Sequence, residues 1–393
     1  MTGPARIAIA IPDFARLGAQ RVAFWVARGL DRARFAPFFL VHEAVGGLAD
    51  QRPSDVPVVE VDRYLPRLRR GRSVARLEGY ARALREHEPA LALGVVQYPT
   101  IALAAARARL RARWPIVGSE HSFVTRNLAD LEAYGPAFRS VYRALLRPLY
   151  NRVVDRVLMT ADEGRDDLVT SFGVARERIV VLPNPIDRAR VASVADEPLE
   201  DPWLPRERRR DAPIPVIVGA GRLVAQKRFD HLVRAFAKVR ARRPARLLIL
   251  GSGAAREKLE ALARELGAAA DVRIEDRSPP WQQMARAALF VLSSEWEGFP
   301  MVLAEAMSLG CPIVSYACPS GPREMLEEGR GGVLVADGDV DALARAIEDA
   351  IAAPERMQQL ARRAEERAKE YGIAEVVRGY EALFDALLAQ RRG

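Results

Sequence analysis

Two glutamates, Glu297 and Glu305, stand eight positions apart in the stretch "EGFPMVLAE". Gly298 and Pro300 between them argue against one continuous helix, but proline is favourable in a helix's first turn. We therefore expect Glu297 in a loop after a strand and Glu305 one turn into the following helix. Carboxylates placed in this way can accept hydrogen bonds from ligand hydroxyls, for example those of a ribose at Glu305 and of a second sugar at Glu297.

The start of that helix offers a second kind of ligand group. We expect the backbone N–H groups of Met301, Val302 and Leu303 to be unpaired there, where they can bind an anion. A purely structural role is the alternative. An acid in the first turn is favourable to the helix dipole, and Glu297 can be a solvated loop charge.

Two cations follow another strand-like stretch, in "GAGRLVAQKRFD" (219–230). The glycines let the backbone approach a ligand, and Arg222 with Lys227 suits a diphosphate. An ordinary turn with two solvated cations is the structural alternative. The segment lacks the third glycine of a dinucleotide fingerprint and lies in mid-chain. Both acids and both cations together favour a nucleotide-sugar site.

The elements that must position these residues alternate between strands and helices, which indicates parallel sheets with helices on both faces. In the first half, the expected strands are 6–11, 35–41, 56–61, 91–96, 115–120, 156–160 and 179–184, and the expected helices include 19–30, 73–87 and 100–112. In the second half, the expected strands are 215–221, 245–253, 271–276, 288–294 and 312–316, and the expected helices include 229–241, 256–267, 280–287, 301–310 and 340–352.

This pattern predicts an α/β protein of two doubly wound, Rossmann-like domains with a ligand cleft between them. We expect residues 1–190 to form the first domain and 213–365 the second. The proline-rich, charged stretch 191–212 is interpreted as the linker. Residues 366–393 are expected to form a C-terminal helix that crosses back to the first domain.

Length and composition agree with two domains. The chain has 393 residues with 49% hydrophobic content, and no run of 18 apolar residues predicts a spanning helix. The amino terminus is interpreted as a first strand rather than a secretory signal. Two cysteines, Cys311 and Cys318, are too few for a disulfide framework, and no Cys/His cluster suggests zinc. We expect a cytoplasmic protein.

The charge is uneven along the chain. Residues 1–190 hold 30 Arg and no Lys against 20 Asp plus Glu, a net +10, so the remainder carries −1 of the total +9. A basic first half suggests an anionic partner. The arginine-rich stretches 63–76 and 107–114 could meet a lipid diphosphate or the anionic inner face of the plasma membrane. Nucleic acid is the weaker alternative, because no nucleic-acid motif accompanies the charge.

Taken together, these motifs resemble the GT4 family of retaining glycosyltransferases, which have the GT-B fold. The resemblance rests on "SSEWEGFPMVLAEAMSLGCPIV" (293–314), "GRLVAQK", "LPNPID" (182–187) and "SEHS" (119–122), in the right order along nearly the whole chain. "LGAQRV" (17–22) is similar to the family's "GGAERV" loop, with Leu17 and Gln20 as departures. "CPSGPREML" (318–326) resembles a subset that adds GalNAc, GlcNAc, galactose or related sugars.

The resemblance implies a role for each matching residue. Arg222 and Lys227 would hold the donor diphosphate, Glu305 the ribose, and Glu297 the 3- or 4-hydroxyl of the transferred sugar. Gly18 would lie against the β-phosphate, and His121 would contact the donor sugar near the reacting centre. Without the resemblance, a lone histidine after a strand is more often structural. The remaining donor contacts would come from the amides of Gly298, Phe299, Met301 and Val302, and from the backbone near Arg277 and Ser278.

The implied activity is retaining transfer of a hexose or N-acetylhexosamine from a nucleotide diphosphate sugar, and a UDP-sugar is the favoured donor. The acceptor would be a saccharide or a lipid-linked saccharide in polysaccharide, lipopolysaccharide or glycan biosynthesis. No cofactor or metal is expected, since the D-x-D spacing in "DGDVD" (337–341) looks like a turn before a helix. The stretch "RIEDRS" (273–278) departs from the family's frequent "FLG" at the base-side turn.

Three rival functions remain open at this point. A nucleotide-sugar epimerase of the same shape would need acid and base residues in the cleft, where His121 is the obvious candidate. A nicotinamide-dependent dehydrogenase would explain the α/β pattern but not the two spaced glutamates. A non-catalytic binding relative would keep the same donor residues.

Overall fold

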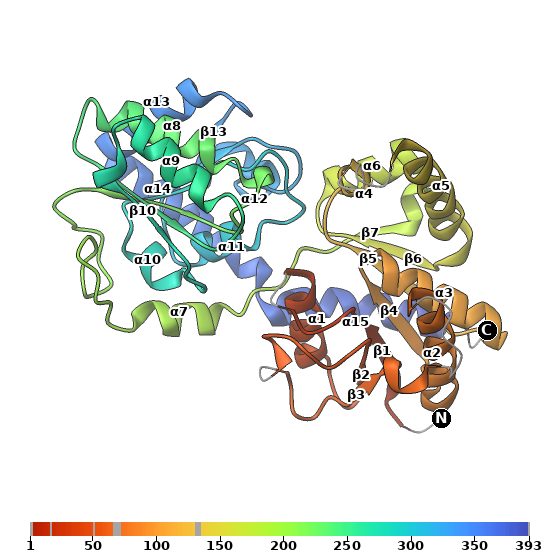
Figure 1. Ribbon diagram of the computed structural model, residues 1–393. Coiled ribbons are helices and arrows are strands. Elements are labelled where there is room, and N and C mark those ends of the chain that lie inside the picture. The colour runs from red at the N-terminus through yellow and green to blue at the C-terminus, as the bar shows by residue number, and fades with distance from the viewer. Residues whose placement is uncertain (1–2, 16–17, 50–51, 66–71, 130–134, 392–393) are drawn as a thin grey trace. The chain divides into compact units, whose positions relative to one another are not determined.

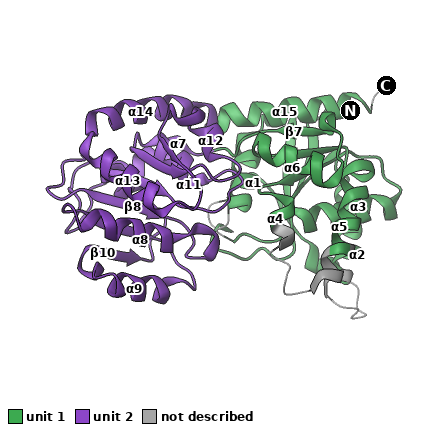
Figure 2. Ribbon diagram, turned by 90° about the horizontal axis from the view of Figure 1, so that it is seen from above, with its two compact units in different colours: residues 1–185, 373–393 green, residues 186–372 purple. Residues whose placement is uncertain are grey.

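The computed structural model describes residues 3–15, 18–49, 52–65, 72–129 and 135–391 (Figure 1). The chain divides into two compact units, shown in green and purple in Figure 2. Unit 1 comprises Met1–Pro185 and Ile373–Gly393, and unit 2 comprises Ile186–Gly372. Each unit is a parallel sheet covered by helices, so the α/β expectation is confirmed.

Unit 1 contains a seven-stranded sheet in the order β3-β2-β1-β4-β5-β6-β7. Its strands are β1 Ala5–Ala10, β2 Phe35–Val41, β3 Val58–Glu60, β4 Leu91–Val95, β5 Ile116–Glu120, β6 Arg156–Met159 and β7 Ile179–Val181. All pairs run parallel. The buried residues of the strands are mostly apolar because helices cover both faces of the sheet.

The helices of unit 1 form two layers. They are α1 Gly18–Gly29, α2 Arg72–His87, α3 Gln97–Leu110, α4 Val124–Ala129, α5 Gly135–Pro148, α6 Asp162–Phe172 and α15 Ile373–Ala389. Alternate strand residues serve the two faces: Ile7 and Ile9 pack in the core with α1 and α15, whereas Ala8 and Ala10 pack in the core with α2 and α3. The carboxyl-terminal helix is therefore an integral part of unit 1.

Unit 2 contains a six-stranded parallel sheet in the order β10-β9-β8-β11-β12-β13. Its strands are β8 Val216–Ala220, β9 Arg246–Leu250, β10 Val272–Glu275, β11 Leu289–Leu292, β12 Ile313–Tyr316 and β13 Val333–Val335. Strand β13 was not expected, because its three residues are too short to give a period. It pairs with β12 in the register Val314↔Val333.

The helices of unit 2 cover both faces of this sheet. They are α7 Arg188–Asp196, α8 Phe229–Arg240, α9 Arg256–Glu265, α10 Trp281–Arg286, α11 Met301–Ser308, α12 Pro322–Met325, α13 Val340–Ala352 and α14 Pro354–Arg367. Two cores result, one on each side of the strands. Among the described residues, no helix is long and apolar enough to cross a membrane.

The expected linker 191–212 is packed into unit 2 instead. Asp187 caps α7 through the N–H of Arg190, and Leu199 and Leu204 are buried in one of the cores. The fully buried Arg286 donates hydrogen bonds to backbone carbonyls at Ala195, Glu197 and Arg206. An irregular segment can be buried in this way because its polar backbone groups find partners.

The last helix also begins later than expected. Instead of one helix over 366–393, α14 is followed by a 3₁₀ turn at Ala368–Tyr371, and α15 starts only at Ile373. Gly372 between them is extended, with φ −60° and ψ 151°. The boundary between units falls at this glycine, where a predominantly polar helix gives way to a more apolar one.

Candidate functional site

The predicted ligand groups of unit 2 follow the strands β8 and β11. These two strands are neighbours in the sheet, although β9 and β10 come between them in the chain. The strand order therefore reverses here, and open α/β sheets bind ligands in the crevice beyond such a reversal. Arg222 and Lys227 lie in the loop after β8, and Glu297 lies in the loop after β11.

Lys227 and Glu297 form an ion pair at this point. The Lys227 Nζ lies 2.5 Å from the Glu297 Oε1, and the two side chains are only 11% and 8% exposed. The Ser294 hydroxyl donates to the same oxygen at 2.6 Å. Glu297 is thus a buried, oriented carboxylate rather than a solvated loop charge. Its Oε1 already has two donors, which leaves Oε2 to accept from a ligand hydroxyl.

The two loops are joined by further hydrogen bonds. The Gln226 side chain donates to the Trp296 carbonyl at 2.8 Å, and the Glu295 N–H donates to the Gln226 carbonyl at 2.9 Å. The Ser293 hydroxyl donates to the Lys227 carbonyl at 2.8 Å. These bonds fix the lysine-bearing loop against the glutamate-bearing loop.

Arg222 is the more accessible of the two predicted cations. Its side chain is exposed, and its Nη2 lies 3.5 Å from the Gln226 Oε1. The close backbone approach behind it requires glycine at residue 251. A Cβ there would lie 1.9 Å from the Gly221 carbonyl oxygen, and φ of Gly251 is +147°. The loop after β8 can therefore pack directly on the end of β9.

Helix α11 begins at Met301, directly after Pro300. The expectation of three unpaired amides was wrong for Leu303, because its N–H donates to the Pro300 carbonyl at 2.9 Å. Met301 and Val302 keep the positions of the first-turn donors that precede the helix's own ladder. Glu305 is 4% exposed, so its side chain is buried rather than solvated.

The segment "CPSGPREML" lies against the glutamate-bearing loop. The Glu297 N–H donates to the Pro319 carbonyl at 3.1 Å, and the Ser320 hydroxyl donates to the Gly298 carbonyl at 2.9 Å. The Phe299 ring is buried and packs edge-on to Tyr371, with ring centroids 5.0 Å apart. Only the backbone of Phe299 is therefore left to meet a ligand.

Arg277 and Ser278 follow β10, which is the edge strand of the sheet. Both are exposed, and the Arg277 Nε lies 3.8 Å from a Glu275 carboxylate oxygen. They share the carboxyl edge with Lys227 and Glu297 but lie beyond β9. Their contact with a base stays a prediction.

The other two predicted residues, Gly18 and His121, belong to unit 1. Gly18 is exposed at the first position of α1. The His121 Nδ1 lies 3.1 Å from the Asn184 Oδ1, and its Nε2 lies 3.1 Å from the Ser119 Oγ. Burial lowers the pKa of His121 to about 4, against the opposing hydrogen bond with Asn184. The imidazole is therefore neutral at pH 7.

A second buried carboxylate, Glu120, precedes His121 at the end of β5. It is 1% exposed, and the Tyr150 hydroxyl donates to its Oε1 at 2.6 Å. Burial raises the pKa of Glu120 to about 7, and the hydrogen bond from Tyr150 opposes this shift. No described cation is paired with this carboxylate.

Sequence reasoning missed the residues that orient the predicted groups. Ser294, Gln226 and Asn184 all lie within or beside the motifs quoted for the resemblance, but nothing in those motifs assigns them a partner. The Asn184–His121 pair spans 63 positions, so local spacing could not reveal it. Among the described residues, no group of three or more His, Cys, Asp or Glu could hold a metal ion.

Two family models match the chain in tandem. The model described as Glycosyltransferase Family 4 matches residues 17–190, and the model described as Glycosyl transferases group 1 matches residues 204–367. The first match falls almost wholly within unit 1 and the second within unit 2.

Curated relatives match over part of their length. An exopolysaccharide phosphotransferase of Streptomyces coelicolor is 30% identical over 241 residues, which are 61% of this chain and 24% of that protein. A Campylobacter jejuni enzyme, named as a 4-alpha-N-acetylgalactosaminyltransferase acting on a diphospho-undecaprenol-linked saccharide, is 26% identical over 242 residues. That match covers 61% of this chain and 63% of the relative. The chain thus spans less than two thirds of each.

Solved structures match over nearly the whole chain. Anabaena HepE, in complex with UDP and glucose, superposes with a TM-score of 0.75 at 18% identity. The match covers 97% of this chain and 99% of that one. Sucrose-phosphate synthase from Thermosynechococcus elongatus gives a TM-score of 0.76 at 18% identity, covering 98% of this chain and 100% of that one. At this identity the likeness establishes the fold, which is that of the GT-B glycosyltransferases.

Proposed function

Because the chain belongs to the glycosyltransferases, with a family 4 domain followed by a group 1 domain, we propose that it is a retaining hexosyltransferase. It takes a hexose or N-acetylhexosamine from a nucleotide diphosphate sugar and transfers it to a saccharide or lipid-linked acceptor. The product belongs to polysaccharide, lipopolysaccharide or glycan biosynthesis. The UDP bound to Anabaena HepE and the lipid-linked acceptor of the Campylobacter relative support the donor and acceptor classes.

The observation that carries this proposal is the Lys227–Glu297 pair at the reversal of strand order. One ammonium hydrogen points to Glu297, and two remain to bind phosphate oxygens. The unoccupied Oε2 of Glu297 accepts from a sugar hydroxyl next to that phosphate. A site with a cation for the diphosphate beside a carboxylate for the sugar matches both halves of a nucleotide sugar.

In the mechanism that we propose, the acceptor hydroxyl attacks on the face from which the nucleotide diphosphate departs. The bond from the anomeric carbon to the phosphate oxygen breaks as the new glycosidic bond forms, and a departing phosphate oxygen accepts the proton. Lys227, Arg222 and the amides at the start of α11 stabilise the departing charge. Catalysis is then mainly positioning and electrostatic stabilisation, without a metal.

Glu305 completes the donor site by accepting hydrogen bonds from the ribose hydroxyls. Arg277 and Ser278 contact the base through their backbone. In the same proposal, Gly18 and His121 of unit 1 contact the donor, and a sugar hydroxyl takes the place of Ser119 or Asn184 as the partner of one His121 ring nitrogen. The epimerase alternative has no observation in its favour.

We also propose peripheral contact with an anionic membrane, supported by the net charge of the first half of the chain. The arginine-rich stretches themselves are partly occupied. Arg107 pairs with Asp155 at 2.7 Å and Arg109 with Glu78 at 2.7 Å, whereas Arg111 and Arg113 are exposed. Residues 66–71 of the stretch 63–76 lie outside the described residues. Flotation with anionic and neutral vesicles tests the contact, which is wrong if both recover the same amount of protein.

Calorimetric binding of UDP, GDP, ADP and NAD⁺, with EDTA present, tests the donor site. We expect a nucleoside diphosphate, UDP above all, to bind the wild type and to bind Lys227→Ala far more weakly. Lys238→Ala is the matched control, because Lys238 is an exposed lysine of unit 2 that pairs with Asp341. Binding of NAD⁺ alone, or diphosphate binding that ignores Lys227, would contradict the proposal. The anomeric configuration of the product, followed by NMR, decides whether transfer is retaining.

A further inference from the structure

A cavity lies at the end of the unit 2 sheet that is opposite to Lys227 and Glu297. It has a volume of about 520 Å³, within the range of small-molecule sites. Pro215, Pro244, Ala288 and Pro312 line it, and each precedes a strand of the sheet. The cavity is thus at the amino ends of the strands, whereas Lys227 and Glu297 follow the carboxyl ends. Nothing in the proposed reaction uses it.

Three arginines line this cavity, Arg210, Arg243 and Arg286, and we call it the arginine cavity. No carboxylate is among the lining residues. Arg210 donates to the Leu309 carbonyl at 2.9 Å, and Arg243 donates to the Glu348 carbonyl at 3.1 Å. Within the part of the chain that the structure describes, none of the three arginines forms a salt bridge. The lining therefore carries positive charge and no carboxylate, and Glu207 and Asp196, which interact electrostatically with Arg286, lie outside it.

Burial makes this charge expensive to hold. Arg286 is 0% exposed, and its guanidinium donates only to backbone carbonyls. The Arg210 Nε is also buried, and it has no hydrogen-bond partner. A buried cation without a counter-charge, or a buried donor without an acceptor, destabilises the folded state. An anion in the cavity would relieve both.

The rest of the lining is apolar. Ala350, Ile351 and Met357 form part of it together with the prolines. Inorganic phosphate alone would leave this surface in contact with water, so the better occupant has an apolar part attached to its anionic group.

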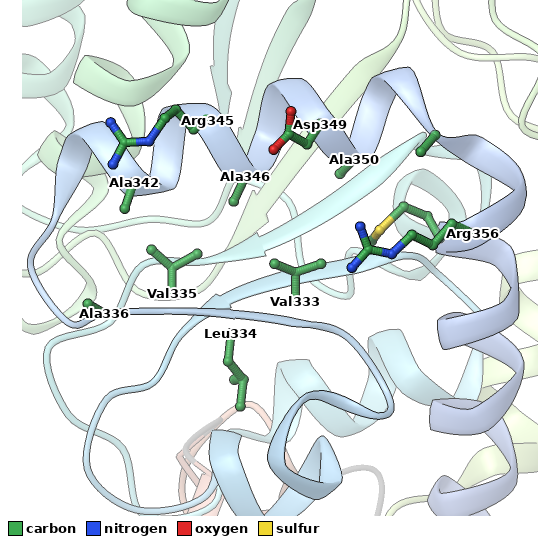
Figure 3. A pocket seen from close by; sticks show the side chains of 12 residues that line it. Val333, Leu334, Val335, Ala336, Ala342, Arg345, Ala346, Asp349, Ala350 and Arg356 are labelled. Carbon is green, nitrogen blue, oxygen red and sulfur yellow. The ribbon is translucent and has the colours of Figure 1, made fainter.

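A neighbouring pocket has both arginines and an acid in its lining. This pocket, of about 370 Å³, lies between β13 and α13 (Figure 3). Its lining includes Arg345 and Arg356, but also Asp349. Val333 and Val335 point toward α13 in Figure 3, whereas Leu334 points away. The arginine cavity lacks an acid in the place that Asp349 takes here.

We propose that the arginine cavity binds an amphipathic organic anion. Arg210 and Arg243 hold the anionic group, with Arg286 adding its field from behind, and the apolar part lies over Ala350, Ile351 and Met357. The site is separate from the donor site and does not depend on the proposed transferase activity.

The test uses calorimetry on the full chain with decyl phosphate, decanoate, decanol and inorganic phosphate, below their aggregation concentrations. We expect decyl phosphate to bind at least tenfold more tightly than inorganic phosphate, and decanol to bind weakly. Decanoate decides between the two head groups: equal affinity means a general anion site, and weaker affinity means a phosphate site. Absence of decyl phosphate binding, or equal binding of decanol, would overturn the proposal.

Two variants place the binding in this cavity. Gln358→Glu adds a carboxylate to the lining at nearly constant volume, and Arg243→Gln removes a cation. We expect each to weaken decyl phosphate binding at least tenfold. Arg242→Gln is the matched control, since Arg242 is next in the chain, pairs with Glu348 at 2.9 Å and does not line the cavity. UDP binding should be the same in all three. Unchanged decyl phosphate affinity in both Gln358→Glu and Arg243→Gln would rule out this site even if Arg243→Gln were unstable.

Discussion

Two of the buried glutamates, Glu297 in unit 2 and Glu120 in unit 1, lie near the carboxyl ends of parallel strands. Glu297 in unit 2 receives an ammonium at 2.5 Å and a serine hydroxyl at 2.6 Å. Among the described side chains, the one that donates to Glu120 in unit 1 is Tyr150, through its hydroxyl, also at 2.6 Å. Without a cation, burial raises the pKa of Glu120 to about 7.

The difference separates two uses of a buried carboxylate. A carboxylate paired with an ammonium is held in place by it and can hold a ligand hydroxyl beside a phosphate. The charge of a carboxyl group paired with a phenol changes with pH, and its charged form destabilises the folded state. Burial alone therefore does not mark a ligand site, and the partner of the buried acid decides its role.

The largest of the predicted effects should come from removing Lys227, the cation that pairs with Glu297. In Lys227→Ala, Glu297 loses its counter-charge and the departing diphosphate loses its stabiliser, so we expect the transfer rate to fall about 10²–10³-fold. Initial rates with the nucleotide sugar measure this, with Lys238→Ala as control. Normal turnover by Lys227→Ala would show that the ion pair is structural only.

The second largest effect concerns the carboxylate without a cation. The folded pKa of Glu120, about 7, lies above its usual value of 4.5, so the folded state binds the extra proton between these pH values. Stability from this group is present below pH 4.5 and is lost as pH rises through 7. Relative to wild type, Glu120→Gln should therefore gain about 2 to 3 kcal/mol of stability between pH 5 and pH 8.

Thermal unfolding at both pH values measures the Glu120 effect as a difference between variant and wild type, in which the opposite contribution of His121 cancels. Burial depresses the pKa of His121, so its contribution is lost as pH falls below its usual value. Glu177→Gln, which makes the same replacement at an exposed glutamate of unit 1, is the control. A Glu120→Gln difference that is equal at both pH values would mean that Glu120 is already charged at pH 5.

A smaller effect is expected from the serine that orients Glu297. A hydrogen bond to a charged group contributes about 1.5–3 kcal/mol, and Lys227 still holds the same oxygen in Ser294→Ala. We expect kcat/KM for the donor to fall about tenfold, near the lower end of that range. Ser294→Thr should restore most of it, which loss of folding would not allow. Ser252→Ala, at an exposed serine after β9, is the control.

The smallest effect is expected from the bond that joins the two loops. Gln226→Leu removes the donor to the Trp296 carbonyl, a neutral hydrogen bond of about 0.5–1.5 kcal/mol. We expect a few-fold rise in the donor KM with little change in unfolding temperature. Gln282→Leu, which removes 3.4 Å contacts elsewhere in unit 2, should leave the KM unchanged. A larger effect of Gln226→Leu than of Ser294→Ala would mean that the bond between the two loops matters more than the serine that orients Glu297.

The sequence was sufficient where local pattern decides structure. Alternating apolar runs and helical stretches predicted the parallel sheets, and Pro300 marked the start of α11 to the residue. It failed where long-range packing decides. The prolines and charges of 191–212 concealed the burial of Leu199 and Leu204, in a segment whose Arg206 carbonyl accepts from Arg286, 80 positions away. For the same reason it named Glu297 and Lys227 as ligand groups but could not show that they contact each other.

The ends of unit 2 meet. The Ile186 N–H donates to the Tyr371 carbonyl at 2.7 Å, and Ile186 bridges to Gly372, so the chain enters and leaves this unit at neighbouring residues. Unit 2 is therefore an uninterrupted insertion into the chain of unit 1, of the kind that can be excised or transplanted as one piece. The loops of the proposed donor site, the arginine cavity and the segment held by Arg286 all belong to residues 186–372. We therefore expect that exchanging residues 186–372 between related enzymes would exchange the proposed donor preference. A fragment that begins after residue 212 would lack α7 and part of the core.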